Sequence, residues 1–565
     1  MRKLTVLLLL LTVFVAISNA AVPKTSAGRV TYKVSYNGKI SETGGITVTY
    51  LNNTVRIDRA GMDGVKIQGM PSETGYIDYA GQKVFQVADL NSGKRISTEQ
   101  GFDKLPKLEM TQETEKILGY TCKKAQTVIR SNKIEIWFTE ESGLKGSPSP
   151  TSGLPNGLVL KIVRNGNYAE IADKIEMLKP NKMKPLLPES MGEVMEAPYY
   201  RQAMNESLVT TVQIFKDEQL SFGNPINNPD PESGATLHYS GGTVIVKKVK
   251  LPSFQTPYDI FAELTQYSNG DAYDRTGSVF VIPVSKSISF LDALQKGIAT
   301  LPVYKDRQGK AYQGVVATDN YEPPVELISF FTPFGIRHFN NQVKVAGITW
   351  EDSVVYRQEV TRLKSLLSGE VWIGVFIGNY DKGGHKVSLK LKYHPSESTT
   401  VSKQWAKPLF CTNNLMEMSG QEYGTMFKDD SLKVDFEVPQ GVKNIQLQYI
   451  STGHGGWDQG DEFVPKLNQI FVDGQNVYGY TPWRCDCGTF RKYNPASGNF
   501  WNGLSSSDLS RSGWCPGTST NPVFIPLNNL KPGKHQLKVA IPIGEREGGS
   551  FSSWCVSGVL TGEIE

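Results

Sequence analysis

Short runs of alternating apolar and polar residues, separated by Gly, Asn and Asp, constrain the fold of this chain more than any other feature. A period near two is typical of half-buried β-strands, whereas an amphipathic helix needs a period of 3.6 residues. No helical stripe of useful length occurs between Val30 and Ile175. We therefore predict an antiparallel β domain here, with strands at 29–36, 45–51, 64–68, 75–87 and 133–138.

Strand signals resume after residue 208, in two blocks of about 170 residues each. The first block has candidate strands at 209–215, 243–251, 278–284, 371–377 and 387–393, and the second at 432–438, 444–450, 468–472, 523–527 and 534–541. Two blocks of many short strands indicate paired β-sandwiches or jelly rolls. The clear helix candidate, 289–299, is interpreted as an insertion.

The first twenty residues are typical of a secretory signal peptide. A basic start, Met1-Arg2-Lys3, precedes an apolar run over 4–17 and the small-residue pattern Ser18-Asn19-Ala20. The alternative, a membrane anchor, would need a run of roughly 20 apolar residues. We therefore expect a secreted or periplasmic protein that has no membrane association after cleavage, in a compartment where disulfides form.

Five of the 12 methionines fall between Met177 and Glu206, among four prolines, which indicates a linker with one short helix. The predicted organisation is a signal peptide (1–20), an N-terminal β domain (21–190), a linker (191–207) and two β-sandwiches (208–395 and 396–565). The fold class expected is all-β.

Composition excludes several functional classes. Hydrophobic residues make up 39% of the chain, enough for several packed cores, so wholesale disorder is excluded. With 60 Lys and Arg against 56 Asp and Glu, the chain is too evenly charged for an electrostatic nucleic-acid binder. The six cysteines and six histidines include no zinc-type spacing, since Cys485-Asp486-Cys487 is a C-x-C pair. We expect no metal and no cofactor.

Three loops concentrate polar and aromatic residues beyond what strand packing requires: 268–275, 451–463 and 511–517. Each has a simple structural explanation. Asp274 and Glu462 can be solvated carboxylates at strand ends, and His454 can hydrogen-bond within its loop. Trp514 can pack on a disulfide formed by its neighbour Cys515.

Together with four further segments, these loops form an ordered series of motifs. The series comprises Thr210-Thr211-Val212-Gln213-Ile214-Phe215, Ser221-Phe222-Gly223, Tyr273-Asp274-Arg275, Phe331-Thr332-Pro333-Phe334, Lys364-Ser365-Leu366-Leu367-Ser368-Gly369, Gly453-His454, Glu462, and Arg511 with Gly513-Trp514-Cys515-Pro516-Gly517. In this order the series resembles the peptide:N-glycosidase F family of secreted bacterial amidases. No single motif is diagnostic, but the ordered set spans some 350 residues.

The resemblance implies two side-by-side eight-stranded antiparallel jelly rolls and hydrolysis of the amide that joins Asn to the first N-acetylglucosamine of an N-glycan. Asp274 matches the family's principal catalytic aspartate, which orients and deprotonates a water, and Glu462 matches its partner glutamate. With one acid in each roll, the site is expected in the cleft between them. The implied substrates are N-glycoproteins and glycopeptides, and a monomer is expected.

The resemblance also implies substrate-binding residues. Arg275 and Arg511 are suited to hold sugar hydroxyls and the carboxylate network through forked donors. Trp514 and Tyr380 are expected to offer flat faces to pyranose rings, and His454 is expected on the rim.

The chain departs from the family pattern at several positions. Gly378 stands where the family has a further active-site glutamate, and Tyr380 where it has tryptophan; either Asn379 or Asp381 compensates, or that carboxylate is dispensable. Thr452 replaces a tryptophan expected beside Gly453, and Trp457 is the nearest candidate. Only one of three expected disulfides survives, pairing Cys515 with either Cys485 or Cys487.

The N-terminal β domain shows a weaker likeness. Residues 119–125 and 153–158 are similar to small exported β proteins of Bacteroidetes named after their G-L-P-G-L-I motif. The domain is then either a solubilising module or one that presents a bulky glycoprotein to the catalytic cleft.

Two other functions stay open. A non-catalytic glycan-binding or adhesin-like protein would keep the two jelly rolls without turnover. A glycosidase that cuts between the two core sugars would leave N-acetylglucosamine on Asn. Retention of both Asp274 and Glu462 in their motifs favours the amidase.

Overall fold

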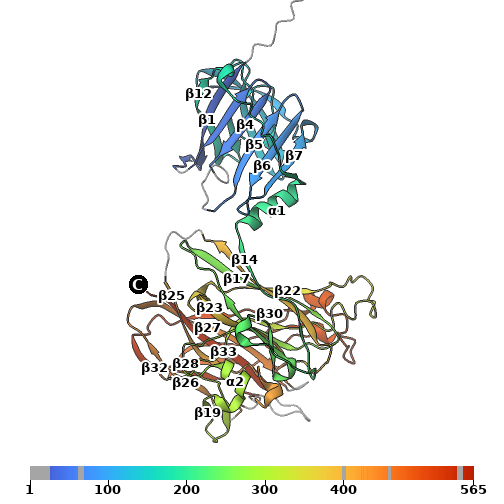
Figure 1. Cartoon of the computed structure of the whole chain (residues 1–565), viewed down its shortest axis with the longest axis vertical. Helices are drawn as coiled ribbons and strands as arrows, with labels where there is room; N and C mark the ends of the chain where they lie inside the picture. Colours follow the sequence, from blue (N-terminus) through green and yellow to red (C-terminus); the bar gives the residue numbers. More distant parts are fainter. Residues whose placement is uncertain are drawn as a thin grey trace, which may run out of the picture. The chain divides into compact units, whose positions relative to one another are not determined.

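The computed structural model describes residues 26–42, 44–60, 69–396, 403–421, 423, 426–428, 431–455, 460–543 and 552–564. The chain divides after Leu208 into two compact units, Met1–Leu208 and Val209–Glu565 (Figure 1). The predicted signal peptide and the predicted strand at 64–68 lie outside the described residues. Among the described residues no helix is long and apolar enough to cross a membrane.

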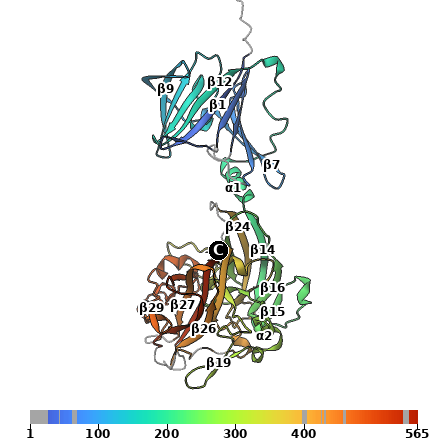
Figure 2. The same cartoon turned by 90° about the vertical axis from the view of Figure 1, so that its left-hand side faces the viewer.

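The first unit is a single curved sheet in which almost all neighbours are antiparallel, as predicted (Figure 2). Its strands are β1 (Ala27–Tyr36), β2 (Lys39–Ile40), β3 (Ile46–Leu51), β4 (Thr54–Arg59), β5 (Ser72–Asp78), β6 (Lys83–Asp89), β7 (Arg95–Gly101), β8 (Glu109–Ile117), β9 (Tyr120–Ile129), β10 (Asn132–Thr139), β11 (Leu158–Arg164), β12 (Tyr168–Met177) and β13 (Glu193–Val194). Their alternate side chains form the unit's own core, around Val34, Val55 and Ile77.

The stretch 75–87, predicted as one strand, is a hairpin of β5 and β6. The side chain of Asp78 accepts the backbone N–H groups of Ala80 and Gly81, both at 3.0 Å, and Gln82 has a positive φ of 52°. Side-chain acceptance by Asp and a left-handed residue together make a tight turn. The strand therefore reverses in the middle of the alternating pattern.

Residues 191–207, assigned to a linker from the sequence, contain β13 and the helix α1 (Ala197–Ser207). The strand β13 pairs in parallel with β7. On α1, Tyr200 and Met204 are buried against Ala88 and Ile96 of the sheet. This segment thus packs on the first unit, and its methionines contribute to a small apolar cluster.

The first jelly roll in the second unit is built from two sheets. One has the order β14-β24-β17-β22 and the other β15-β16-β23-β18-β21-β30. These strands are β14 (Thr210–Leu220), β15 (Leu237–Tyr239), β16 (Val244–Lys250), β17 (Tyr258–Ser268), β18 (Thr276–Ile282), β21 (Val325–Phe331), β22 (Val354–Glu359), β23 (Glu370–Ile377), β24 (His385–Pro395) and β30 (Ser519–Thr520); β19 (Val303–Lys305) and β20 (Ala311–Gln313) form a separate hairpin.

The count differs from the expected eight strands. Within the described residues this roll has nine strands of its own, and β30 is added from the second roll. The extra strand, β15, forms at the edge because Leu237 is fully buried in the cluster that also holds Phe290 and Trp372.

The second jelly roll has eight strands among its described residues, in two sheets of order β25-β33-β27-β31 and β26-β32-β28-β29. They are β25 (Lys403–Cys411), β26 (Leu432–Val438), β27 (Val442–His454), β28 (Asn468–Val472), β29 (Gln475–Tyr480), β31 (Val523–Pro526), β32 (Gly533–Ala540) and β33 (Ser553–Ile564). Strict alternation along β26 buries Leu432, Val434 and Phe436 and exposes the residues between them.

The helix predicted at 289–299 is confirmed as α2 (Phe290–Lys296). The helix begins with a capping box. The side chain of Asp292 accepts the Ser289 N–H at 2.9 Å, and the Ser289 side chain accepts the backbone N–H of Asp292. Its apolar face packs on the sheet through Phe290 and Ala293.

Candidate active site

Asp274 lies in the loop between β17 and β18, directly before β18 begins. The buried Thr332 holds the backbone on both sides of it. The Thr332 hydroxyl accepts the N–H of Arg275 at 2.7 Å and donates to the carbonyl of Tyr273 at 3.1 Å. Because both neighbours are fixed, the backbone of Asp274 is fixed as well.

Glu462 comes from the second roll, in the loop that follows β27. Its carbonyl accepts the N–H of Ser512 at 2.9 Å, and the carbonyl of Ser512 accepts the N–H of Gly453 at 3.0 Å. The loop is thus tied to the strand end at Gly453 and to the segment that carries Arg511. This places the acid from the second roll beside the 511–517 motif.

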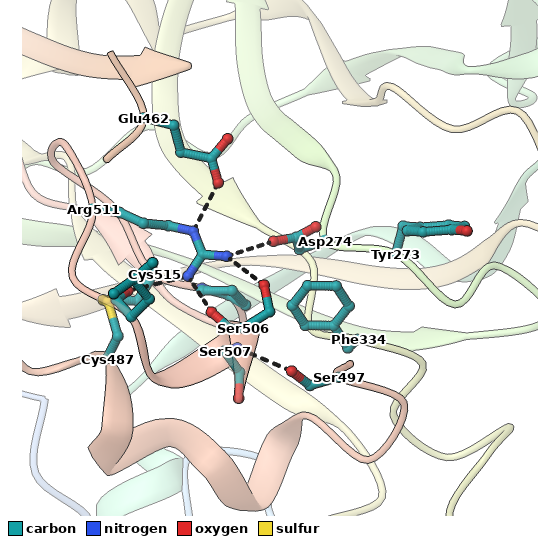
Figure 3. Close-up of polar contacts among 12 residues, drawn as sticks. Tyr273, Asp274, Phe334, Glu462, Cys487, Ser497, Ser506, Ser507, Arg511 and Cys515 are labelled. Carbon is teal, nitrogen blue, oxygen red and sulfur yellow. Dashed lines mark hydrogen bonds and ion pairs between the residues drawn. A yellow bond between two sulfur atoms is a disulfide. The ribbon is translucent and has the colours of Figure 1, made fainter. Parts of the chain in front are cut away.

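Arg511 joins the two acids, and its side chain is 1% exposed (Figure 3). Its Nε donates to Glu462 Oε1 at 2.9 Å, and Nη2 donates to Asp274 Oδ2 at 3.4 Å. The remaining donors reach the hydroxyl and carbonyl of Ser506 and the carbonyl of Leu509. All five guanidinium N–H groups therefore have protein acceptors, so Arg511 positions carboxylates and has no donor left for sugar hydroxyls.

The electrostatics of this trio favour a proton on one acid. Burial raises the pKa of Asp274 to about 7; the charge of Glu462 adds to the rise and that of Arg511 opposes it. Burial also raises the pKa of Glu462, again against Arg511. Two carboxylates share one guanidinium, so near neutral pH the trio can gain or lose a proton at Asp274. This is what acid–base chemistry requires.

Trp514 lies beneath Arg511 and is 3% exposed. One ring face stacks on Phe331, with centroids 4.2 Å apart, and the Arg511 guanidinium carbon lies 4.8 Å from the ring centroid. Its Nε1 donates to the carbonyl of Gly453 at 3.0 Å. The expectation that Trp514 offers a face to a pyranose is not met by this position, because burial leaves it no free face. Its ring supports the guanidinium.

The surviving disulfide joins Cys515 to Cys487 (Figure 3). Of the two partners expected for Cys515, it is therefore Cys487 and not Cys485 that forms the bond. Cys485 is a free, exposed cysteine. The bond ties the segment after Arg511 to the 3-10 helix at Cys487–Tyr493.

His454 packs with the same aromatic cluster, its ring centroid 5.5 Å from those of both Phe331 and Trp514. Its Nε2 lies 2.8 Å from the Thr452 hydroxyl. Burial and the charge of Arg511 lower the pKa of His454 to about 3, so the imidazole is neutral at working pH. A neutral, packed imidazole agrees better with the simple explanation, a hydrogen bond within its own loop, than with the expected position on the rim of the site.

Arg275 belongs to a second cluster. Its Nε and Nη2 donate to the buried Asp271 at 2.7 and 3.2 Å, and His385 Nε2 lies 3.4 Å from the same carboxylate. Although burial opposes them, these hydrogen bonds hold the pKa of Asp271 below its usual value. The Arg275 guanidinium lies 4.9 Å from the ring of Tyr273 and 5.2 Å from that of Tyr380.

Both tyrosines are well exposed, Tyr273 by 61% and Tyr380 by 54%. Their exposed rings can contact a ligand. The hydroxyl of Tyr380 donates to Glu417 at 3.0 Å, a carboxylate that sequence motifs did not indicate.

Both residues considered as substitutes for the family's further glutamate form local hydrogen bonds. Asn379 is fully buried and donates to the carbonyl of Ile377. Asp381 accepts the N–H groups of Gly383 and Gly384 and so closes its own turn. Trp457, the other uncertain position, lies outside the described residues.

Several residues of the site escaped sequence reasoning. Thr332 and Phe331 lie within a motif that was used only for its resemblance, while Ser506 lies in the serine run that precedes Arg511. Within the described ranges, no group of three or more His, Cys, Asp or Glu is placed to hold a metal ion.

The chain matches three family descriptions: "Peptide-N-glycosidase F, N terminal" over residues 211–393, "Peptide-N-glycosidase F, C terminal" over 422–561, and "N-glycanase peptide, N-terminal domain" over 30–202. A solved structure described as PNGF-II in a P21 space group is 44% identical and covers 96% of this chain and 100% of its own, with a TM-score of 0.87. This protein belongs to the peptide-N-glycosidase F family. The likeness of its first unit to the G-L-P-G-L-I proteins stays a prediction.

Two further solved structures are similar to this chain over different shares of its length. PNGase F, described as a glycosylasparaginase from Flavobacterium meningosepticum, is 16% identical, with a TM-score of 0.43; the match covers 63% of this chain and 96% of that one. A second PNGF-II structure, in a C2 space group, is 44% identical over 96% of this chain and 98% of its own, with a TM-score of 0.80. A search of curated proteins found no match. Family membership supports a deglycosylating hydrolase.

Proposed function

We propose that this protein hydrolyses the amide bond between an Asn side chain and the first N-acetylglucosamine of an N-linked glycan, giving Asp and a glycosylamine. The observation that carries the proposal is the bridge by Arg511, which holds Asp274 and Glu462 in one partly enclosed group. These two side chains keep 17% and 20% of their surface exposed, so a substrate can reach them.

In the proposed reaction, ionised Asp274 accepts a proton from water as its oxygen bonds to the amide carbon. The carbon–nitrogen bond then breaks, and the leaving nitrogen takes the proton back from Asp274 or from an acid form of Glu462. Glu462 also hydrogen-bonds the substrate amide and stabilises the charge that develops. One water is consumed: its OH stays on the amide carbon, and its proton passes through an acid to the leaving nitrogen. The glycosylamine later loses ammonia.

Arg511 is proposed as a positioning residue, since it has no donor to spare. Arg275 is proposed to bind the sugar together with Tyr273 and Tyr380, because exposed aromatic faces and a guanidinium are suited to pyranose rings and their substituents. His454 is proposed to keep the aromatic floor of the site packed. The proposed substrates are N-glycoproteins and glycopeptides, met outside the cytoplasm after removal of residues 1–20.

Mass spectrometry of a denatured N-glycoprotein tests the proposal. The peptide released by hydrolysis carries Asp, so it is heavier than the same peptide with an unmodified Asn by the difference between OH and NH2. Asp274→Asn is expected to abolish the conversion. Asp473→Asn serves as the matched control, because this exposed carboxylate lies in the second roll and pairs with His535.

The same assay separates the competing functions. Glycan binding by the wild type without any change in mass would favour a non-catalytic binding protein. Release of the glycan with N-acetylglucosamine left on an unchanged Asn would favour a glycosidase acting between the core sugars. Conversion by Asp274→Asn at the wild-type rate would show that the acid–base role assigned to this residue is wrong.

A further inference from the structure

Trp501 is almost fully exposed, at 98% of its surface. It lies at the turn of a short hairpin, residues 497–507, between the disulfide-linked helix and Arg511. Single exposed apolar residues are ordinary on protein surfaces, so exposure alone carries no argument. The significance of Trp501 lies in how this hairpin is built and in its attachment to Asp274, Glu462 and Arg511.

The hairpin is held by a regular set of hydrogen bonds. Phe500 N–H donates to the Leu504 carbonyl at 2.8 Å, and Gly503 N–H donates to the Phe500 carbonyl at 2.9 Å. Gly503 has a φ of +83°, a conformation that favours glycine, and Asn502 Oδ1 accepts the N–H of Leu504 at 3.0 Å. The backbone that presents Trp501 is therefore well defined.

Two contacts attach this hairpin to the catalytic residues. Ser506, on its second arm, accepts hydrogen bonds from Arg511 through both its carbonyl and its hydroxyl (Figure 3). Phe500, on its first arm, lies edge-on to Phe463 with ring centroids 6.4 Å apart, and Phe463 directly follows Glu462. The turn is thus fixed relative to both carboxylates.

The spacing along the hairpin sets how far Trp501 lies from Ser506, the residue that contacts Arg511. Ser506 pairs with Gly498, whose carbonyl accepts its N–H at 2.8 Å, and Trp501 is three residues farther along the arm. At about 3.3 Å per residue, the Trp501 backbone lies roughly 10 Å from the Ser506 level. This separation is longer than one sugar ring, which is the basis for assigning the indole to a sugar beyond the first N-acetylglucosamine.

The chemistry of the hairpin favours a neutral, hydroxylated ligand. No residue between Ser497 and Ser507 carries a charge, and the residues next to Trp501 in the sequence include Asn499, Asn502 and Gly503. An indole face packs well on the C–H face of a pyranose, and side-chain amides both donate to and accept from hydroxyls.

From these observations we propose that Trp501 is a specificity-determining residue that stacks on a pyranose of the N-glycan distal to the first N-acetylglucosamine. The inference rests on the proposed function, and it extends the glycan contacts from the Arg275 cluster in the first roll to a hairpin in the second. It predicts that the enzyme distinguishes long glycans from short ones through this side chain.

Kinetics on two glycopeptides of identical peptide sequence test the proposal, one with a full core oligosaccharide and one with a single N-acetylglucosamine. Trp501→Ala is expected to lower kcat/KM about tenfold on the full glycan and to leave the short substrate unchanged. Trp501→Phe is expected to recover most of the loss. Phe524→Ala, at a 39% exposed aromatic position on β31, is the matched control.

Three outcomes would overturn the proposal: an equal loss on both substrates, no loss on either, or a loss that follows the peptide sequence and not the glycan. The first would place the effect at Arg511, and the third would identify a peptide contact. Thermal unfolding of Trp501→Ala is expected to match wild type, since the side chain packs on little.

A binding measurement keeps the inference separate from the proposed function. The core oligosaccharide without peptide is titrated into wild type and Trp501→Ala by calorimetry, where no cleavage is needed. Weaker binding by the variant supports the inference even if the wild type cleaves no amide. Equal binding by both proteins overturns it, whatever the cleavage assay shows.

Discussion

The hydroxyl of Thr332 accepts the backbone N–H of Arg275 at 2.7 Å, and so a buried threonine of the first roll fixes the peptide that carries the proposed base Asp274. Because the same hydroxyl donates to the carbonyl of Tyr273, it restrains both peptide units around the acid. We therefore expect catalysis to depend on a residue with no role in the chemistry.

Thr332→Val keeps the shape of this side chain and removes its hydroxyl. The variant leaves the partly buried N–H of Arg275 and carbonyl of Tyr273 without their partner, which costs about 1–3 kcal/mol of stability. We expect kcat to fall at least tenfold with little change in KM, because Asp274 loses its orientation. Steady-state kinetics check this, and Thr332→Ser should restore most of the rate. Unaltered kcat in Thr332→Val would rule out the positioning role.

Arg511→Lys tests the bridge between the two acids. A lysine has one compact ammonium and cannot reproduce the forked donors that reach Glu462, Asp274 and Ser506. We expect a drop of about a hundredfold in kcat/KM, and for Arg511→Ala a loss of about 3–5 kcal/mol in unfolding free energy, since two carboxylates lose their counter-charge. Arg484→Lys, whose partner Asp486 is exposed, should change either quantity little. Wild-type kinetics in Arg511→Lys would contradict the model of a positioned pair.

The pH dependence follows from the direction of the Asp274 shift. Since its pKa is raised to about 7 and the ionised form is the proposed base, kcat/KM is expected to rise with pH through about 7. A profile on a glycopeptide substrate from pH 5 to pH 9 measures it. Activity that is constant across this range would place the base elsewhere.

The same shift predicts a cost in stability. The folded state holds the Asp274 proton more tightly than the unfolded chain, so the contribution of this group is retained at low pH and lost as pH rises toward about 7. Asp274→Asn should therefore be more stable than wild type at pH 8 by on the order of 3 kcal/mol, and the difference should shrink toward pH 4. Denaturant unfolding at both values checks it. A difference that does not vary with pH would indicate another cause.

The disulfide between Cys487 and Cys515 should stabilise the segment that carries Arg511. It closes a loop of 28 residues. Such a loop is worth about 3 kcal/mol in the chain-entropy model, and so Cys487→Ser with Cys515→Ser should lower the unfolding free energy by that amount. Calorimetry with and without reductant measures the effect. Cys485→Ser is the control, and an equal loss in that variant would contradict the assigned pairing.

Removal of the first unit distinguishes its two predicted roles, as a solubilising module or as a domain that presents glycoproteins. Each unit has its own core, so a chain that begins at Val209 is expected to fold. We expect turnover of an intact glycoprotein to fall several-fold and that of a short glycopeptide to stay the same. Equal losses on both substrates, or none, would show that the unit only solubilises the enzyme.

The sequence predicted many of the strands and the α2 helix, because period-two alternation and a Ser–Asp cap are local signals, and its ordered motifs indicated Asp274 and Glu462 as candidate acids. The hairpin of β5 and β6 was missed because its turn depends on hydrogen bonds to the side chain of Asp78, while the alternating pattern continues through the turn. The role of Trp514 was missed for a different reason. Whether a tryptophan stacks on a sugar or beneath an arginine depends on Phe331, 183 residues away in the sequence, and no local pattern records that contact.

The addition of β30, a strand of the second jelly roll, to a sheet of the first has a consequence for solubility. Every residue of β21 is buried, and on the edge away from β18 the second roll supplies the partner strand β30, opposite Ser329 and Phe330. Without the second roll, this apolar edge would be exposed. Such edges recruit other chains and lead to aggregation. In this enzyme the second roll therefore protects the first from self-association, and a gene fragment that ends before the second roll should yield an insoluble product.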